Sequence, residues 1–182
     1  NGSLHDWKTN IARYCVDNKL LMLSACAAFA GPLLDKVNMD GGGFHIYGTS
    51  STGKSTTSRV SASVFGEYND FMKNWRCTNN GLEAMAAIYN DSILILDEIS
   101  QNKSGIENNV YMLANGNGKV RANRFGGACK SKKWKVFVLS NGERTADSHA
   151  QESSNKTVNA GAQLRMLNIP VSGKYGIYDN LH

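Results

Sequence analysis

The chain has 182 residues, with 20 Lys and Arg against 15 Asp and Glu, which gives a formal net charge of +5. A chain of this length fits one domain that buries roughly 70% of its unfolded surface. The 2 prolines and the 41% of hydrophobic residues argue against intrinsic disorder, and the 18 glycines follow no collagen period. The basic balance is compatible with a phosphate-rich partner.

The cysteines and the apolar segments indicate the cellular environment. No C-x-x-C pair and no zinc-ligand spacing occurs, which favours reduced thiols in a cytoplasmic protein. The most apolar stretch covers residues 20–30, which is shorter than the about 20 residues that a bilayer span requires. We therefore expect a cytoplasmic protein with a buried helix at this stretch and no contact with a membrane.

Hydrophobic periodicity and turn residues predict alternating helices and strands. In chain order we expect helices over residues 5–18 and 19–30, a strand over 44–47, a helix over 54–65, a strand over 71–77, a helix over 81–89, a strand over 93–96, a helix over 104–114, a basic hairpin over 119–133 that turns at Gly126-Gly127, a strand over 134–139, an exposed loop over 145–157 and a last strand ending at Pro170. This alternation favours an α/β fold with a mainly parallel sheet of about five strands. We expect residues 1–40 to form an N-terminal helical segment packed on a core of residues 41–182.

The clearest chemical signal is the run from Gly48 to Ser55, which satisfies the Walker A pattern G-x-x-x-x-G-K-[ST] between a predicted strand and a predicted helix. Glycines let the backbone fold around a phosphate, and the helix N-terminus adds its positive end. Lys54 would reach the β- and γ-phosphates, and the Ser55 hydroxyl would ligate Mg²⁺. A glycine-rich turn that only caps a helix is the alternative. The predicted nucleotide-binding residues are Gly48, Ser50, Ser51, Thr52, Gly53, Lys54, Ser55 and Thr56.

Two carboxylates follow the apolar run Ile93–Leu96, as in a Walker B strand that is covered on both faces. Asp97 would hold Mg²⁺ together with Ser55, mostly through water, and Glu98 would polarise the attacking water. Lys54 and Asp97 are 43 residues apart, which leaves room for two helices and a strand between them. The Walker B strand is therefore not expected to be the next strand after the glycine-rich loop. A strand with an acidic turn is the structural alternative.

Asn141 and Arg165 complete the predicted catalytic set with Glu98. Asn141 ends the next buried strand, the sensor-1 position of additional-strand P-loop ATPases, and its amide can both donate and accept a hydrogen bond. The alternative is an Asn that begins the Asn141-Gly142 turn. Arg165 precedes the final strand, where AAA+-type modules place an arginine finger for the neighbouring subunit's nucleotide. Arg144 is the reserve candidate, and an exposed or salt-bridged arginine is the alternative.

Seven cations and no acid lie between residues 119 and 135. A hairpin inserted there would project into a central pore and contact a phosphate backbone. A solvated edge strand protected by lysines is equally compatible with the pattern. The predicted DNA-binding residues are Lys119, Arg121, Arg124, Lys130, Lys132 and Lys133.

Taken in order, these motifs resemble the P-loop ATPase module of phage, plasmid and mobile-element replication proteins, which is catalogued as domain of unknown function 927 and described as helicase-like within the AAA+ group. The resemblance covers residues 4–182. It rests on residues 44–55, Ala62–Gly66, Trp75, Thr78–Glu83, Leu96–Ile99, Tyr111–Gly116, Leu139–Glu143, Ala160, Gly161, Arg165, Ile169 and Pro170.

The resemblance implies an AAA+-like fold of the additional-strand type, with ATP and Mg²⁺ as cofactors. It also implies hydrolysis between the subunits of a ring, with a hexamer favoured, and unwinding of or translocation on single-stranded or forked DNA. A primase or another replication protein is an implied partner. The resemblance also implies a helical lid after the final strand, which this sequence does not show. We therefore expect an ATP-dependent DNA helicase or translocase of a mobile genetic element.

Two other functions would use the same glycine-rich loop. One is an ATP-gated loader or scaffold that binds DNA without unwinding it, in which the nucleotide shifts the assembly state. The other is a P-loop small-molecule kinase, which the long spacing from Lys54 to Asp97 and the adjacent Glu98 disfavour.

Overall fold

A single sheet of five parallel strands organises the computed structural model, which describes residues 2–102, 105–121, 127, 129–154 and 160–178. The strand order is β2-β3-β4-β1-β5. Because β4 lies between β1 and β3, the strand that precedes the glycine-rich loop is not adjacent to the strand that ends in Asp97. This order confirms the additional-strand arrangement. The strands are β1 (Gly42–Tyr47), β2 (Met72–Asn74), β3 (Ser92–Asp97), β4 (Val136–Gly142) and β5 (Met166–Pro170).

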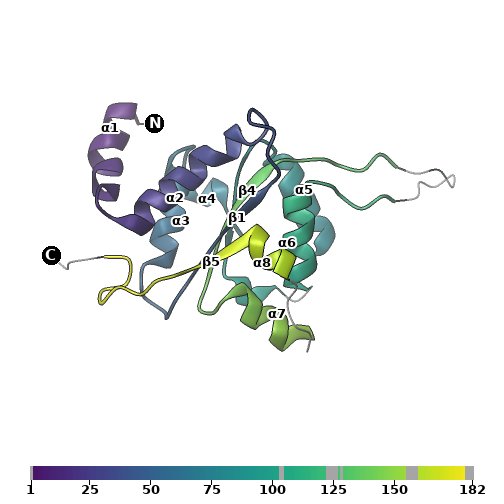
Figure 1. Ribbon diagram of the computed structural model, residues 1–182. Helices are drawn as coiled ribbons and strands as arrows, with labels where there is room; N and C mark the ends of the chain where they lie inside the picture. The colour runs from purple at the N-terminus through teal and green to yellow at the C-terminus, as the bar shows by residue number, and fades with distance from the viewer. Residues whose placement is uncertain (1, 103–104, 122–126, 128, 155–159, 179–182) are drawn as a thin grey trace.

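Helices cover both faces of this sheet (Figure 1). The α-helices are α1 (Leu4–Asn10), α2 (Lys19–Ala30), α3 (Lys54–Ser63), α4 (Tyr68–Phe71), α5 (Asn79–Ile88), α6 (Ile106–Asn115), α7 (Ala146–Ser154) and α8 (Ala160–Arg165). Short 3₁₀ turns are η1 (Ala12–Cys15), η2 (Gly31–Leu33) and η3 (Ile99–Gln101). Within the described residues, none of the helices has the length and apolar character that crossing a bilayer would require.

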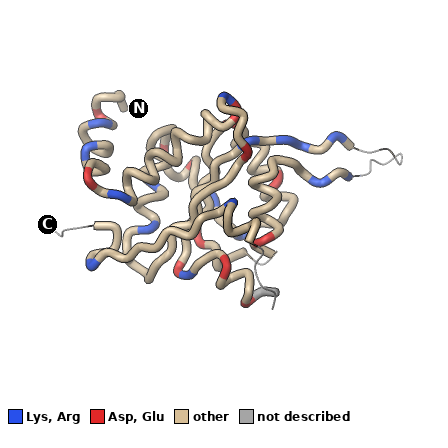
Figure 2. Tube along the Cα trace, in the orientation of Figure 1, with Lys and Arg blue, Asp and Glu red and all other residues tan. Residues whose placement is uncertain are grey.

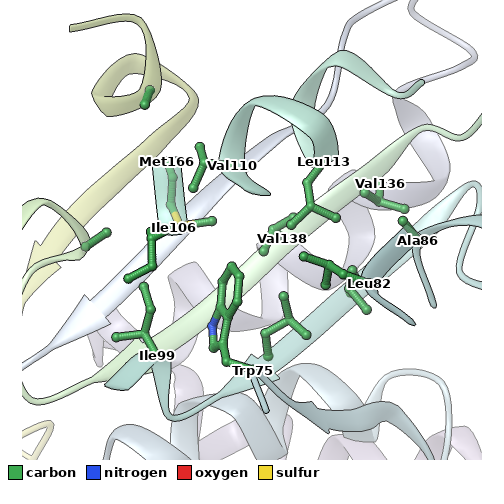
Figure 3. Close-up of a cluster of buried hydrophobic side chains, with 14 of the residues drawn as sticks. Trp75, Leu82, Ala86, Ile99, Ile106, Val110, Leu113, Val136, Val138 and Met166 are labelled. Atoms are coloured by element: carbon green, nitrogen blue, oxygen red, sulfur yellow. The ribbon is translucent and has the colours of Figure 1, made fainter. Parts of the chain in front are cut away.

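The alternation of side chains along β3 divides the core into two clusters. Leu94 and Leu96 face a cluster formed with α5, α6, α7 and α8, and Figure 3 shows Trp75 among the residues at its centre. Ile93 and Ile95 face the opposite cluster, which α2 and α3 cover. The predicted double-sided burial of this strand is confirmed, because all four residues are 0% exposed.

Three sequence predictions differ from the observed elements. The exposed loop expected over residues 145–157 is wrong for the described part, where α7 buries Ala146 and Ala150. The helix expected over residues 5–18 ends at Asn10, and the chain continues in η1. The strand expected over residues 71–77 shortens to Met72–Asn74, because the Asn74 side chain accepts a hydrogen bond from the Arg76 N–H at 2.7 Å and turns the chain.

The basic segment between α6 and β4 leaves the body of the protein as two antiparallel arms (Figure 1). Gly118 N–H donates to the Lys132 carbonyl at 2.8 Å, and Cys129 N–H donates to the Arg121 carbonyl at 2.6 Å. We call residues 117–121 and 129–133 the basic arms. Their pairing agrees with the predicted hairpin, but Gly126 of the predicted turn and Arg124 lie outside the described residues.

Candidate functional site

The glycine-rich loop joins β1 to α3, and at Gly53 its backbone has a conformation that few other residues adopt. Gly53 has φ +89°, and a Cβ atom at this position would lie 2.6 Å from Cγ1 of Ile177. The Lys54 ammonium and the Thr52 hydroxyl both donate to the carbonyl of Thr49, at 2.6 Å and 2.8 Å. Since α3 begins at Lys54, its unpaired N–H groups and the positive end of its dipole face the loop.

A cleft of about 380 Å³ lies at the carboxyl edge of the sheet, where this loop meets the ends of β3 and β4. The structure thus brings together most of the predicted site. Glu143 also lines the cleft and was missed, because no spacing pattern singles it out. Gly48 does not line the cleft, and its N–H instead donates to the Gly142 carbonyl at 3.2 Å. The predicted residues in the cleft are Ser50, Ser51, Thr52, Gly53, Lys54, Ser55, Thr56, Asp97, Glu98 and Asn141.

Asn141 connects three parts of the cleft. Its Nδ2 donates to Oδ1 of Asp97 at 2.6 Å and to the Ser58 hydroxyl of α3 at 3.1 Å. Its Oδ1 accepts the backbone N–H of Glu98 at 3.1 Å. The side chain is buried, with 3% exposure. One amide therefore fixes the Asp97 carboxylate and the Glu98 backbone relative to the helix that follows the glycine-rich loop.

Glu98 has a strained backbone at the edge of the cleft. Its φ of +58° is in the left-handed region, which a non-glycine residue adopts at a cost of about 1 kcal/mol or more. Its Oε1 accepts a hydrogen bond from the Ser100 hydroxyl. This backbone turn separates the Glu98 carboxylate from the hydrophobic core and leaves it lining the cleft beside Asp97.

Ser55 and Asp97 are suited to a magnesium ion. Both line the same cleft, and hydroxyl and carboxylate oxygens are ligands that Mg²⁺ prefers. No cluster of three or more His, Cys, Asp or Glu side chains suited to a metal occurs among the described residues. This donor set fits an ion that takes most of its ligands from phosphate and water.

A buried hydrogen-bond chain supports the strand ends beneath the cleft. The Trp75 indole donates to the Ser140 hydroxyl at 2.8 Å, and this hydroxyl lies 2.9 Å from Nδ1 of His45. His45 Nε2 donates to the Arg144 carbonyl at 2.8 Å, which fixes the tautomer so that Nδ1 accepts. Burial lowers the pKa of His45 to about 4. No sequence pattern predicts these hydrogen bonds, because the residues that make them are far apart in the sequence.

The segment after β5 packs on the glycine-rich loop, which the sequence also did not indicate. Ile177 N–H donates to the Thr52 carbonyl at 2.9 Å, and the Ile177 carbonyl accepts from Asn18 at 2.7 Å. The Ile177 side chain is buried against Cys15, Leu21 and Val60. The loop is therefore held between the sheet and the chain that follows the last strand.

A second cavity, of about 570 Å³, lies between η1, α2 and α3 and was not predicted. Half of its lining residues are apolar or aromatic, including Ile11, Tyr14 and Val60, and half are polar or charged, including Asp17 and Arg59. Thr56 lines this cavity and also the cleft. The two spaces thus adjoin at the first turn of α3.

Neither predicted arginine lines the cleft of its own chain. The Arg165 guanidinium lies 4.9 Å from the centroid of the Tyr111 ring and donates to the Gly161 carbonyl at 3.0 Å. Arg144 pairs with Glu152 on α7. A finger acts on a neighbouring subunit's nucleotide, so the position of Arg165 on one chain leaves that role a prediction.

The basic arms carry cations and no acid, as Figure 2 shows for their described parts. The side chains of Lys119, Lys130, Lys132 and Lys133 are exposed. Arg121 differs, since its guanidinium donates to Glu83 and to Asn80. Arg124 lies outside the described residues.

Two solved structures are similar to this chain. The SCCmec type IV Cch active helicase has a TM-score of 0.66 and 23% sequence identity, over 93% of this chain and 31% of that chain. The Hsp104–ADP complex of S. cerevisiae has a TM-score of 0.49 and 12% identity, over 94% of this chain and 37% of that chain. This chain thus spans about a third of the length of each of these proteins.

The likeness to the helicase shows a P-loop NTPase fold. No curated protein matches the chain. The family model described as "Domain of unknown function (DUF927)" matches residues 1–134, which is more than half of the sequence, and the chain belongs to this family.

Proposed function

We propose that this chain is the ATP- and Mg²⁺-dependent motor module of a protein that moves on DNA. The observation that carries the proposal is the set of hydrogen bonds made by Asn141, which tie Asp97 and Glu98 to the helix of the glycine-rich loop. A loop that only capped a helix would not need a buried amide between two carboxylate residues and that helix. This arrangement is instead suited to hydrolysis of a phosphoanhydride.

The loop and α3 bind the triphosphate in this proposal. Backbone N–H groups of residues 50–55 and the positive end of α3 attract the phosphate oxygens, whereas the Thr56 N–H already donates to the Gly53 carbonyl at 2.8 Å. Lys54 exchanges the Thr49 carbonyl for phosphate oxygens, which are stronger acceptors for its ammonium group. Ser55 and Asp97 would hold Mg²⁺, which neutralises phosphate charge when it is bound.

Glu98 serves as the general base for the attacking water. Its carboxylate lines the cleft beside Asp97, and its backbone is fixed by Asn141. Ser100 bonds one carboxylate oxygen and leaves the second oxygen to accept a water proton. The residue types and their placement favour hydrolysis over transfer to a small-molecule acceptor.

The cavity beside Thr56 suits the base of the nucleotide. Its lining by Ile11, Tyr14 and Val60 offers apolar and aromatic contact area. The cavity and the phosphate cleft share Thr56 as a lining residue, and in this proposal a single nucleotide occupies both spaces. The triphosphate then lies at the loop and the base between η1 and α3.

Assembly and DNA contact complete the proposal. The likeness to a structure described as an active helicase supports a motor role. Replication of a mobile element is the role that the motif resemblance implies. Arg165 acts on the nucleotide of the next subunit in a ring, for which the family resemblance favours a hexamer, with a primase or another replication protein as a further partner. The exposed lysines of the basic arms contact the phosphates of single-stranded or forked DNA.

The test is the rate of ATP hydrolysis per subunit against protein concentration, with and without single-stranded DNA. A site completed by Arg165 of a neighbour gives a specific activity that rises with concentration, and DNA increases it further. A rate per subunit that is independent of concentration would contradict the shared site. Strand displacement by the full-length protein then separates a helicase from a loader that binds DNA without unwinding it.

A further inference from the structure

A carboxylate is buried beneath the base of the basic arms. Glu83, on α5, is 2% exposed. Its Oε1 accepts the backbone N–H of Lys119 at 3.1 Å, and its Oε2 accepts from the Arg121 guanidinium at 2.8 Å. Both donors belong to the first arm. One carboxylate therefore holds two residues of this arm against the body of the protein.

The environment keeps this carboxylate charged. Burial alone raises the pKa of Glu83, but the Lys119 N–H, the Arg121 guanidinium and the charge of Lys119 together lower the pKa below its ordinary value. Gly118 leaves room for the pair, since a Cβ atom there would lie 3.2 Å from Oε2 of Glu83. Arg121 also donates to Oδ1 of Asn80 at 2.7 Å, so its guanidinium group bonds two acceptors on α5.

The side chains of the other described cations of the arms form no such ion pair with the body of the protein. Lys119, Lys130, Lys132 and Lys133 have exposed side chains and make no ion pair within the described part of the chain. If Arg121 moved to a phosphate, the buried Glu83 would lose its ion pair and keep only the Lys119 N–H and the more distant Lys119 charge, which is unfavourable. The lysines carry no such penalty.

We propose that Glu83 and Arg121 are positioning residues that fix the direction of the basic arms, and that the lysines, not Arg121, contact a polyanion. The inference deepens the proposed function, and it rests on that function only where DNA binding is measured. It separates Arg121, whose side chain is bound within the fold, from the four lysines, whose side chains act on the partner.

The first test is binding of the full chain to a single-stranded oligonucleotide over a series of salt concentrations. Glu83→Ala removes a negative charge near the arms, so simple electrostatics predicts tighter binding. Positioning instead predicts binding weaker by about 10-fold with an unchanged salt slope, since the lysine contacts remain in number. Unchanged or tighter binding would overturn the proposal. Asp35→Ala is the matched control, because it removes an exposed carboxylate that pairs with Lys135 at 3.3 Å.

Arg121 is tested by its salt dependence and by rescue. Arg121→Ala should weaken binding and keep the slope of log K against log salt, whereas Lys132→Ala should reduce the slope by about 0.7, the value for one phosphate of a single strand. Arg121→Lys should restore most of the affinity, because an ammonium still reaches Glu83. A slope reduced by Arg121→Ala as much as by Lys132→Ala would show that Arg121 contacts phosphate.

Hydrogen exchange tests the contact without DNA. In Glu83→Ala the Lys119 amide should exchange at least about 10-fold faster, while the amides of β4 keep their rates. The isosteric Glu83→Gln should show a smaller increase. Unchanged exchange at Lys119 would overturn the positioning role. If the wild-type chain does not bind the oligonucleotide, the proposed DNA contact fails, and this measurement still decides the role of Glu83.

Discussion

The amide nitrogen of Asn141 and the carboxylate of Asp97 are joined by a hydrogen bond of 2.6 Å at the adjacent ends of β4 and β3. The same nitrogen donates to Ser58 on α3, so the pair links β3 to the helix of the glycine-rich loop. Because the sheet places β4 between β1 and β3, Asn141 is the residue positioned to make this link. The strand order and the chemistry of the cleft are therefore directly related.

Replacement of Asn141 should separate nucleotide binding from turnover. Asn141→Ala releases the Asp97 carboxylate and the Glu98 backbone, so we expect turnover to fall by at least about 10-fold while ATP affinity changes little. Asn141→Asp should be worse, since it places a second carboxylate against Asp97. Steady-state kinetics with equilibrium nucleotide binding measures both values. Wild-type turnover in Asn141→Ala would show that the amide has only a structural role in the turn.

Gly53→Ala should destabilise the fold and abolish tight nucleotide binding. The new methyl group meets Ile177 at 2.6 Å on a backbone with φ +89°, so we expect a loss of about 2 kcal/mol in the free energy of unfolding. Gly81→Ala is the matched control, because its methyl group makes only ordinary contacts, at 3.4 Å or more, in the first turn of α5. That variant should be neutral or more stable by about 0.5 kcal/mol. Urea unfolding measures the free energy of unfolding of both variants. Equal values for Gly53→Ala and Gly81→Ala would contradict the strain at Gly53.

The buried His45 predicts a pH dependence of stability. Burial is the main cause that lowers the pKa of His45 from 6.5 to about 4, while the Arg144 carbonyl opposes it. Between these pH values the unfolded chain binds a proton that the folded chain does not. Stability therefore falls by about 3 kcal/mol as the pH drops from 6.5 to 4, and this term is absent above pH 6.5.

Urea unfolding across this pH range measures the effect of His45. His45→Gln removes the titrating ring, so the unfolding free energy of this variant should vary less between pH 6.5 and 4 than that of the wild type. Parallel pH profiles of the two proteins would mean that His45 titrates normally in the folded state.

Tyr14 tests the proposed base cavity. Tyr14 lies in the lining of the cavity that adjoins the phosphate cleft. If the base contacts this ring, Tyr14→Ala should weaken ATP binding by about 10-fold, the scale of one aromatic–base contact. Binding of inorganic tripolyphosphate should not change, because that ligand occupies only the cleft. Equal losses for both ligands would place the effect of Tyr14 at the loop and exclude a base contact.

The sequence predicted the cleft better than the elements around it. The residues that match the Walker A and Walker B patterns follow local sequence patterns, since a phosphate-binding loop would need its glycines and its lysine at set positions. Residues 146–154 were expected in a loop because their side chains are mostly polar. The helix forms there through contacts from far along the chain, as when Ala146 N–H donates to Asn168 at 3.0 Å.

Thr145 carried a signal that was overlooked. Its hydroxyl accepts the N–H of Ser148 at 3.1 Å, which is the bond of a helix N-cap. In contrast, no local pattern predicts the packing of Ile177 against the glycine-rich loop. The same holds for the hydrogen bonds that connect Trp75 to His45 through Ser140. Such contacts depend on how distant segments pack, and a single sequence does not reveal them.

The most direct measurement compares ATP binding and ATP hydrolysis in Glu98→Gln. The variant keeps the size of the side chain and removes the base, so we expect ATP affinity within about 3-fold of wild type and turnover reduced by at least about 100-fold. Glu67→Gln, which alters an exposed acid on another part of the surface, should turn over ATP at the wild-type rate. Undiminished hydrolysis in Glu98→Gln, or no ATP binding by the wild-type chain, would contradict the account.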